Sequence, residues 1–437
     1  MLIERESVDL HTGKFCYDLV SELYPICRSL TGPGVRETLQ VIKKYIPELS
    51  IKEIESGKKV FDWTIPDEWS VSDAYVEDHN GKKVVDFSEH NLHLVGYSEP
   101  VDTYLTLEEL NQKLYSLPSQ PDAIPYVTSY YSRGWGFCLT QYQRDRLLPG
   151  TYHAVIKSEF KKGVLNYGEL LIPGKEKKIL LSTYICHPSM ANNELSGPAV
   201  TVALTQWLFS LANRCFSYRI IFIPETIGSI AYLSNNLEYL KANVVAGFNV
   251  TCIGDDRCYS YLPSRSGQSL SDQAAQHVLR YIDSNYKKYS WLDRGSDERQ
   301  YCAPGVDLPV ASIMRSKYGE YPEYHTSLDD LSLVSAVGLE GGGTALKNAI
   351  EVIEANCYPK ITVLCEPQLG KRGLYPQVST KESGLSVQTM MNFISYCDGK
   401  NSLLDIAELI NVPMLSLNKI LQDLIKAELI KISYEKI

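Results

Sequence analysis

Short apolar segments alternate with longer amphipathic ones over about residues 166–360. The apolar segments include KKILLSTYI, FSYRIIFIP, NVVAGFNVTCIG and LPVASIMR, and stretches such as PAVTVALTQWLFSLANR separate them. Buried strands that alternate with helices predict a layered α/β domain with a largely parallel sheet. Two segments within residues 1–50 have apolar residues at helical spacing, so we expect them to complete one face of this core.

The segments around this core have different patterns. Residues 51–165 contain short, alternating, aromatic-rich runs separated by Asn-Gly and Pro-Gly pairs, which predicts an inserted, mainly β domain. Residues 384–437 follow the order helix, short turn, helix and strand, which predicts a winged-helix-like domain. The expected division is a core of residues 1–50 and 166–365, an inserted domain and a C-terminal domain.

The composition argues against several classes of function. The 437 residues carry a net charge of −9, which gives no general attraction to nucleic acid or to anionic membranes. We find no apolar signal segment and no apolar run long enough to span a bilayer. Eleven cysteines occur without a CxxC pair, which is typical of reduced, buried thiols rather than of disulfides. We therefore expect a cytoplasmic protein without a membrane partner.

The C-terminal segment has few basic residues. Residues 391–437 contain five lysines, no arginine and six acidic residues. Proteins that bind DNA use basic side chains to neutralise phosphates. The composition therefore argues against nucleic acid as a partner, in spite of the winged-helix-like pattern, and favours dimerisation or docking. We expect a homo-oligomer.

Polar side chains follow several of the predicted strands at the point where each strand ends. His187 follows ILLSTYI, Glu225 follows RIIFIP, Thr251 follows AGFNV, and His325 comes one loop after VASIMR. Ligands of open α/β sheets bind beyond the carboxyl ends of the strands. Imidazoles and a carboxylate at such an edge can hold Zn²⁺ with one position left open for water.

Each of these residues also has a purely structural interpretation. His187 could be a hydrogen-bonded histidine at a strand end, and Glu194 could cap the next helix together with the asparagines before it. Glu225 could stabilise a helix N-terminus, and His325 could be an ordinary loop residue. Each structural interpretation is the more common one taken singly, but four coincidences at strand ends together favour a site.

These segments resemble the zinc aminopeptidases of the M28 type. YHTSLDD is similar to the YHTxxD segment of that family, and ILLSTYICH to the strand that ends in its first metal-binding histidine. The resemblance implies that His325 and His187 are metal ligands. PETIGS resembles the Glu-Glu segment and implies that Glu225 is the general base. SDERQYCAPGVDLPVASI resembles the segment around a further site aspartate, which corresponds to Asp297.

Three carboxylate positions of that family are neutral in this chain. NNELSG resembles the DDxxSG stretch, so Asn192 stands where an aspartate would bridge two metals, and Thr226 and Thr251 replace two further acids. Without these charges a two-metal centre is not expected. We predict one zinc ion per chain, held by His187, Glu194 and His325, a His₂Glu set.

Nearly the whole chain resembles a bacterial family of aminopeptidase-like proteins, the DUF4910 type. SLTGPGVRETL, FDWTIPDEW, YYSRGWGFCLT and CHPSMANNELSG carry this resemblance. It implies a three-layer α/β/α, zinc-peptidase-like core with a mixed sheet, an inserted mainly-β domain and a C-terminal winged helix.

Three residues are candidates for substrate binding. Arg133 lies among aromatic residues and glycines of YYSRGWGFCLT and could pair with a carboxylate or a sugar, or could belong to a hairpin with aromatic packing. Arg299 could line the pocket or form a surface ion pair. Asn193, next to the predicted ligand Glu194, is the third candidate.

Three functions are compatible with these observations. The first is a zinc-dependent hydrolase of an amide bond, most simply an aminopeptidase that acts on a small peptide, with catalytic roles for Glu225 and Asp297. The second is an amidase or deacylase that acts on a modified sugar or amino acid, with the β insertion selecting the substrate. The third is a non-catalytic binding or scaffold protein that has lost its metal ligands.

Overall fold

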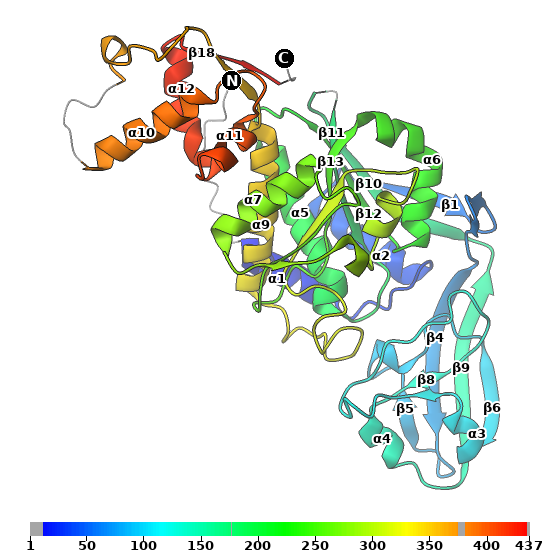
Figure 1. The fold of residues 1–437 in the computed structure, drawn as a ribbon. Coiled ribbons are helices and arrows are strands. Elements are labelled where there is room, and N and C mark those ends of the chain that lie inside the picture. The colour runs from blue at the N-terminus through cyan, green and yellow to red at the C-terminus, as the bar shows by residue number, and fades with distance from the viewer. Residues whose placement is uncertain (1–11, 176, 375–380, 435–437) are drawn as a thin grey trace.

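The core is built on one eight-stranded mixed sheet (Figure 1). The computed structural model describes residues 12–175, 177–374 and 381–434. Residues 1–11 and 176 of the predicted core and residues 435–437 of the predicted C-terminal domain therefore lie outside the described residues. The sheet consists, in spatial order, of β1 (Ser50–Glu55), β10 (Val164–Ile172), β12 (Ser217–Ile223), β11 (Lys178–Tyr184), β13 (Val244–Asn249), β16 (Val310–Met314), β14 (Ser260–Leu262) and β15 (Lys287–Lys288). The central strands β12, β11, β13 and β16 are parallel. Strand β10 pairs antiparallel with both β1 and β12, and β14 pairs antiparallel with β16 but parallel with β15.

Strand β11 shows why the core has three layers. All seven of its residues are buried. Ile179 and Leu181 belong to the apolar core on one face of the sheet, and Leu180 belongs to the core on the other face. Side chains alternate between the two faces of a strand, so a fully buried strand requires a cover on both sides. The predicted α/β/α architecture with a mixed sheet is confirmed.

Helices cover both faces of this sheet. The first face packs against α1 (Thr12–Leu23), α2 (Pro33–Tyr45), α5 (Ser196–Ser210), α7 (Leu270–Ile282) and α9 (Ala336–Ala355). The second packs against α6 (Ile227–Asn243) and α8 (Glu298–Tyr301). None of the helices in the described part of the chain is long and apolar enough to cross a membrane.

The inserted domain contains a four-stranded antiparallel sheet. Its strands are β5 (Lys83–Asp86), β4 (Glu68–Glu77), β9 (Thr151–Lys161) and β6 (Val101–Thr106), in this spatial order. Shorter elements complete it: β2 (Lys59–Val60), β3 (Trp63–Thr64), α3 (Leu107–Asn111), β7 (Leu114–Tyr115), β8 (Phe137–Cys138) and α4 (Gln141–Asp145). Our predicted boundary placed β1 in this domain, but β1 pairs with β10 at the edge of the core sheet. Most of its residues are exposed, as in an edge strand, and the sequence does not distinguish such a short strand from the strands of the insertion.

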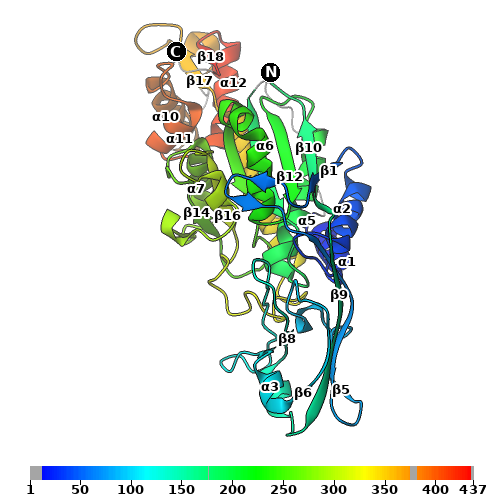
Figure 2. The same cartoon turned by 90° about the vertical axis from the view of Figure 1, so that its right-hand side faces the viewer.

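The C-terminal domain begins earlier than we predicted from the sequence. Strand β17 (Tyr358–Ile361) pairs with β18 (Ile430–Ser433) and thereby brings the two ends of the domain together. Between them lie α10 (Lys381–Ser395), α11 (Leu403–Leu409) and α12 (Asn418–Lys426). Figures 1 and 2 show this domain and the inserted domain at opposite ends of the core.

Candidate metal centre

His187 is held in one orientation at the end of β11. Its Nδ1 lies 2.6 Å from Oε2 of Glu194, and its backbone carbonyl accepts a hydrogen bond of 2.9 Å from Nε of Arg28. Glu194 lies in a π-helical turn, Ala191–Leu195, directly before α5. Both side chains are buried. Because Glu194 occupies Nδ1, the ring nitrogen that remains for other partners is Nε2.

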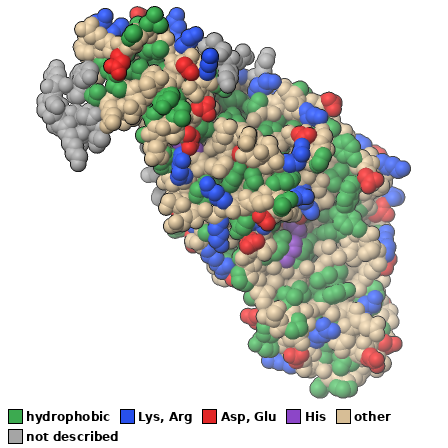
Figure 3. Space-filling model, viewed as in Figure 1, with side chains coloured by type: hydrophobic (Ala, Val, Ile, Leu, Met, Phe, Trp, Pro, Cys, Tyr) green, Lys and Arg blue, Asp and Glu red, His purple; other side chains and the backbone are tan. Residues whose placement is uncertain are grey.

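Two further predicted residues meet on the Nε2 side of His187. Nε2 lies 3.6 Å from Oε2 of Glu225, which follows β12. The ring centroid of His325 lies 5.4 Å from that of His187, and the Tyr126 ring packs edge-on at 5.2 Å and 5.1 Å from the two imidazoles. Figure 3 shows histidine atoms at the surface between the core and the insertion. Three strand-end residues far apart in sequence therefore come together.

The carboxylates of Glu194 and Glu225 lie at different distances from the ring nitrogens of His187. Two donors of a tetrahedral zinc, each about 2.0–2.2 Å from the ion, lie about 3.4 Å apart. The 3.6 Å between Nε2 and Glu225 is compatible with a shared ion, whereas the 2.6 Å between Nδ1 and Glu194 is a charge-assisted hydrogen bond. The site chemistry therefore offers two imidazoles and Glu225 as one donor set, with Glu194 behind His187.

Cys186 also lies close to this pair. Ligand atoms of Cys186, His187 and Glu194 all lie within 4.8 Å of one another. The backbone N–H of Glu225 donates to the Cys186 sulfur at 3.2 Å. Burial raises the pKa of the Cys186 thiol to about 11, so the thiol is protonated at neutral pH when no metal is bound.

Asp297 lies beside Glu225. Its Oδ1 accepts hydrogen bonds of 2.7 Å from both the Thr226 N–H and the Ser229 hydroxyl, while its buried Oδ2 has no hydrogen-bond partner among the described residues. Burial and the charge of Glu225 raise the pKa of Asp297 to about 8. Burial also raises the pKa of Glu225. The two acids therefore share a proton more readily than they carry two charges.

The three neutral replacements are engaged within the protein, and the Thr226 hydroxyl accepts a hydrogen bond of 2.8 Å from Arg299. The Asn192 amide donates to Oδ2 of Asp255 at 3.0 Å and accepts from the Gly254 N–H at 2.9 Å. The Thr251 hydroxyl lies 2.5 Å from the Tyr184 hydroxyl. The side chains at these positions stabilise the fold and leave no carboxylate for a second ion.

The predicted substrate-binding residues lie at different distances from this site. Arg299 donates to the Thr226 hydroxyl at 2.8 Å and so lies next to the Glu225 loop. The Asn193 amide donates to the Tyr184 hydroxyl at 2.9 Å and is buried, so it contributes to the floor of the site. Arg133 lies on the inserted domain with its guanidinium over the Phe160 ring.

Backbone strain is concentrated at these strand ends. Thr226 and His325 have φ angles of 63° and 55°, and Ser189 and Cys252 are also left-handed, at 46° and 47°. Residues other than glycine rarely adopt this conformation, and it costs about 1–3 kcal/mol each unless the surroundings enforce it. Such strain at several loops of one edge is typical of a functional site.

Two residues of the site did not emerge from the sequence. Tyr126 belongs to the insertion, and its backbone N–H donates to the His325 carbonyl at 2.9 Å, so the insertion holds the histidine loop. Nothing in the local sequence relates Tyr126 to His325. Asp329 accepts from the backbone N–H groups of Asn192 and Asn193 at 2.6 Å and 2.9 Å. The YHTxxD pattern contains this aspartate and could have identified it.

The comparisons with known proteins agree with this architecture. The family model described as a domain of unknown function, DUF4910, matches residues 17–356, and a winged helix-turn-helix model matches residues 356–432. A Clostridium acetobutylicum protein, whose name links it to polysaccharide biosynthesis and gives it an aminopeptidase-like domain, is 46% identical over 399 residues, 91% of each chain.

Two solved structures show the same fold. A crystal structure of a Clostridium acetobutylicum protein named as a candidate peptidase is 43% identical, covers 97% of both chains and has a TM-score of 0.91. The zinc aminopeptidase of Bacillus subtilis has a TM-score of 0.58 at 12% identity, over 78% of this chain and 94% of its own. The second likeness shows an aminopeptidase-like fold. The chain belongs to the DUF4910 family, with a winged helix at its C-terminus.

Proposed function

We propose that the chain is a single-zinc hydrolase of amide bonds, most simply an aminopeptidase-like enzyme. One observation carries this proposal: Nε2 of His187 faces Glu225 at 3.6 Å and lies beside the His325 ring, while Glu194 fixes Nδ1. A carboxylate on the second ring nitrogen is what orients a metal-binding histidine.

The donor set fits one zinc ion. His187, His325 and Glu225 would hold it, as a His₂Glu set does in zinc hydrolases. Our sequence prediction gave Glu194 the ligand role, but its short hydrogen bond to Nδ1 supports the orienting role instead. The engaged side chains of Asn192 and Thr251 argue against a second ion.

The residues of this chain have separate tasks in the proposed reaction. The zinc ion that His187, His325 and Glu225 would hold would supply polarisation of the amide carbonyl and activation of water for attack on it. A cation held by Glu225 would offset the negative charge that helps to raise the pKa of Asp297, which favours the ionised form of Asp297. Oδ2 of the ionised Asp297, which has no other partner among the described residues, would take the proton that water loses and return it to the leaving nitrogen as the C–N bond breaks. Arg299 holds the loop of Glu225 through Thr226.

A second candidate is hydrolysis of an amide on a modified sugar or amino acid. The Clostridium acetobutylicum relative carries polysaccharide biosynthesis in its name. The aromatic residues of the insertion reach the site through Tyr126, whose ring packs against both histidines. The position of the inserted domain beside the site supports a role for this domain in selecting the chemical group that is attached to the amide.

The winged helix supports the proposal of a protein partner rather than nucleic acid. Asn418 and Gln422 of α12, the second helix of the helix-turn-helix, line a cavity together with Trp207 and Arg214 of the core. These α12 residues therefore face the hydrolase core. We propose a homo-oligomer in the cytoplasm, which sedimentation and fractionation would test.

Substrate panels separate the two candidate reactions. Aminoacyl anilides and N-acetylated amino sugars are offered to protein purified without chelators, and release of amine is measured. Turnover of the anilides supports the aminopeptidase and turnover of the sugars supports the deacylase. Bound zinc without turnover of either class would refute both enzymes as stated.

A further inference from the structure

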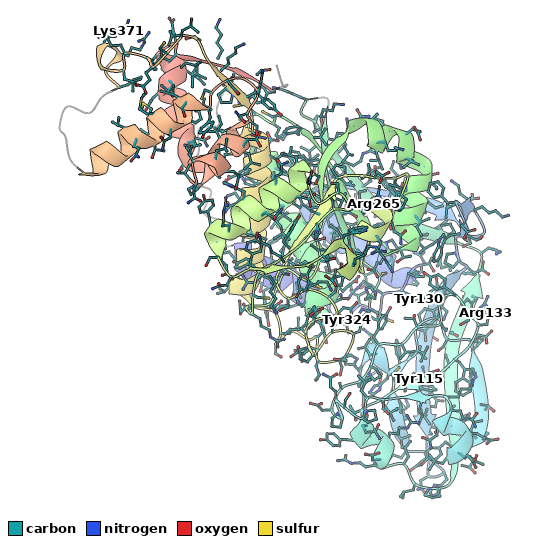
Figure 4. All side chains as sticks on the ribbon, viewed as in Figure 1. Tyr115, Tyr130, Arg133, Arg265, Tyr324 and Lys371 are labelled. Carbon is teal, nitrogen blue, oxygen red and sulfur yellow. The ribbon has the colours of Figure 1, made fainter. Side chains whose placement is uncertain are left out.

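A cleft of about 210 Å³ lies on the inserted domain, on the side that adjoins the core. Figure 4 shows Tyr130 and Arg133, which line it, between the core and the β sheet of the insertion. The lining residues that matter for the argument are Asp67, Tyr97, Tyr130, Tyr131, Arg133 and Phe160. Aromatic faces and one arginine therefore dominate its walls.

Arg133 gives this cleft a positive charge. Its guanidinium lies 3.8 Å from the centroid of the Phe160 ring, which holds the side chain in place. Within residues 12–175, 177–374 and 381–434, no ion pair involves Arg133, and Asp67 is paired with Nζ of Lys162 at 2.6 Å. The cleft therefore lacks an internal partner for the guanidinium.

A continuous row of rings leads from this cleft to the candidate metal centre. Phe160 contacts Tyr97 at 5.8 Å between centroids, and Tyr97 contacts Tyr130 at 5.2 Å. The Tyr130 hydroxyl lies 2.6 Å from that of Tyr126, whose ring packs against His187. A molecule in the cleft thus lies one tyrosine away from the histidine pair.

The chemistry of the walls defines the group that fits. Tyrosine faces pack against a flat ring, and the exposed Tyr131 and Ser132 offer hydroxyls at the rim for a hydroxylated one. A free guanidinium binds carboxylate or phosphate with two parallel hydrogen bonds. The volume suits a single ring rather than a polymer chain.

We propose that this cleft is the specificity subsite of the hydrolase and binds an anionic saccharide ring, the part of the substrate that is not cleaved. The assignment rests on the proposed function for its role in catalysis, but binding itself requires neither metal nor turnover. Carboxylate and phosphate share the chemistry that Arg133 recognises, so both forms of the ring are tested.

The test is a ligand-observed NMR titration of the full chain with glucuronate, glucose 1-phosphate and glucose. We expect at least one of the two anions to bind about tenfold more tightly than glucose, because one charge-assisted pair is gained. The anion that gains more identifies carboxylate or phosphate as the natural group. Arg133→Met should remove the difference, and Arg133→Lys should restore part of it. Arg146→Met, which removes an exposed arginine of the same domain, should leave it unchanged.

Three results would overturn the assignment. The first is equal affinity for glucose and both anions, and the second is an unchanged preference for the anions in Arg133→Met. The third is phenylacetate that binds as tightly as glucuronate, which would show that the cleft does not recognise a saccharide ring. If the chain binds the anionic sugars but hydrolyses no amide, the subsite assignment stands and the proposed function is wrong. If the chain hydrolyses amides but does not prefer the anionic sugars, the proposed function stands and the subsite assignment is wrong.

Discussion

Removal of the charge of Glu194 tests how the candidate site is held together. Glu194 has two partners: its Oε2 lies 2.6 Å from His187 Nδ1, and its Oε1 lies 3.9 Å from Arg28 Nε. The side chains of Glu194 and Arg28 are both 0% exposed. Glu194→Gln keeps the shape of the side chain and leaves the Arg28 guanidinium buried without a counter-charge.

The structure sets the size of the expected effect. Two unit charges at this distance attract by about 4 kcal/mol at an effective dielectric constant of about 20. Removal of one partner of a buried pair costs about 3–5 kcal/mol. We therefore expect Glu194→Gln to lower the free energy of unfolding of the metal-free core by about 3–5 kcal/mol. Loss of the group that orients a metal-binding histidine should also weaken zinc binding about 10–100-fold.

Two assays measure these effects separately. Urea denaturation of chelator-treated protein reports the stability, and competition with a zinc chelator reports the affinity. Glu238→Gln, an exposed glutamate of α6, is the matched control. Adding Arg28→Met to Glu194→Gln should recover part of the lost stability, since the buried cation is then gone. A variant that unfolds and binds zinc as the control does would refute the role of Glu194.

Three other perturbations have defined outcomes. Glu225→Gln should lose zinc, and retained zinc would return Glu225 to the general-base role. Asp297→Asn should keep zinc and lose turnover of the active substrate, and undiminished turnover would remove Asp297 from proton transfer. His277 of α7 accepts from the Met414 N–H at 2.9 Å and donates to Glu408 at 2.5 Å, which requires the neutral ring, and burial lowers the pKa of His277. The neutral His277 ring stabilises the contact between α7 and the C-terminal domain. This stabilisation is fully present above about pH 6.5 and is lost as the pH falls through the lowered pKa of His277. The rate of proteolysis between the domains should therefore increase at acidic pH in the unmodified chain. If that rate is independent of pH and equal to the rate of the His277→Gln variant, the prediction is wrong.

The fold could be predicted from the sequence where strands are buried on both faces. Strand β11 is buried throughout because helices cover both of its sides, and its apolar run Ile179–Leu181 is visible without a structure. The edge strand β1 could not be assigned to the core, because it is short and mostly exposed and it directly precedes the strands of the insertion. Strand β17 was missed for a similar reason: it is a short strand, and its partner β18 lies at the far end of the domain.

The residues of the candidate site could be predicted from the sequence, but the role of each residue could not. The strand-end positions of His187, Glu225 and His325 are features of the sequence. The ring nitrogen that Glu194 occupies depends on a π-helical turn, and the contact of Tyr126 depends on the docking of a whole domain. Both are properties of tertiary structure that no local pattern encodes.

Elemental analysis for zinc tests the central claim most directly. The full chain is purified without chelators, supplied with zinc and freed of excess metal before the measurement. The account predicts about one zinc per chain, and nearly none in His325→Ala, while Glu238→Gln keeps the content of the unmodified chain. Absence of stoichiometric zinc, two ions per chain, or an undiminished content in His325→Ala would contradict the single-zinc site.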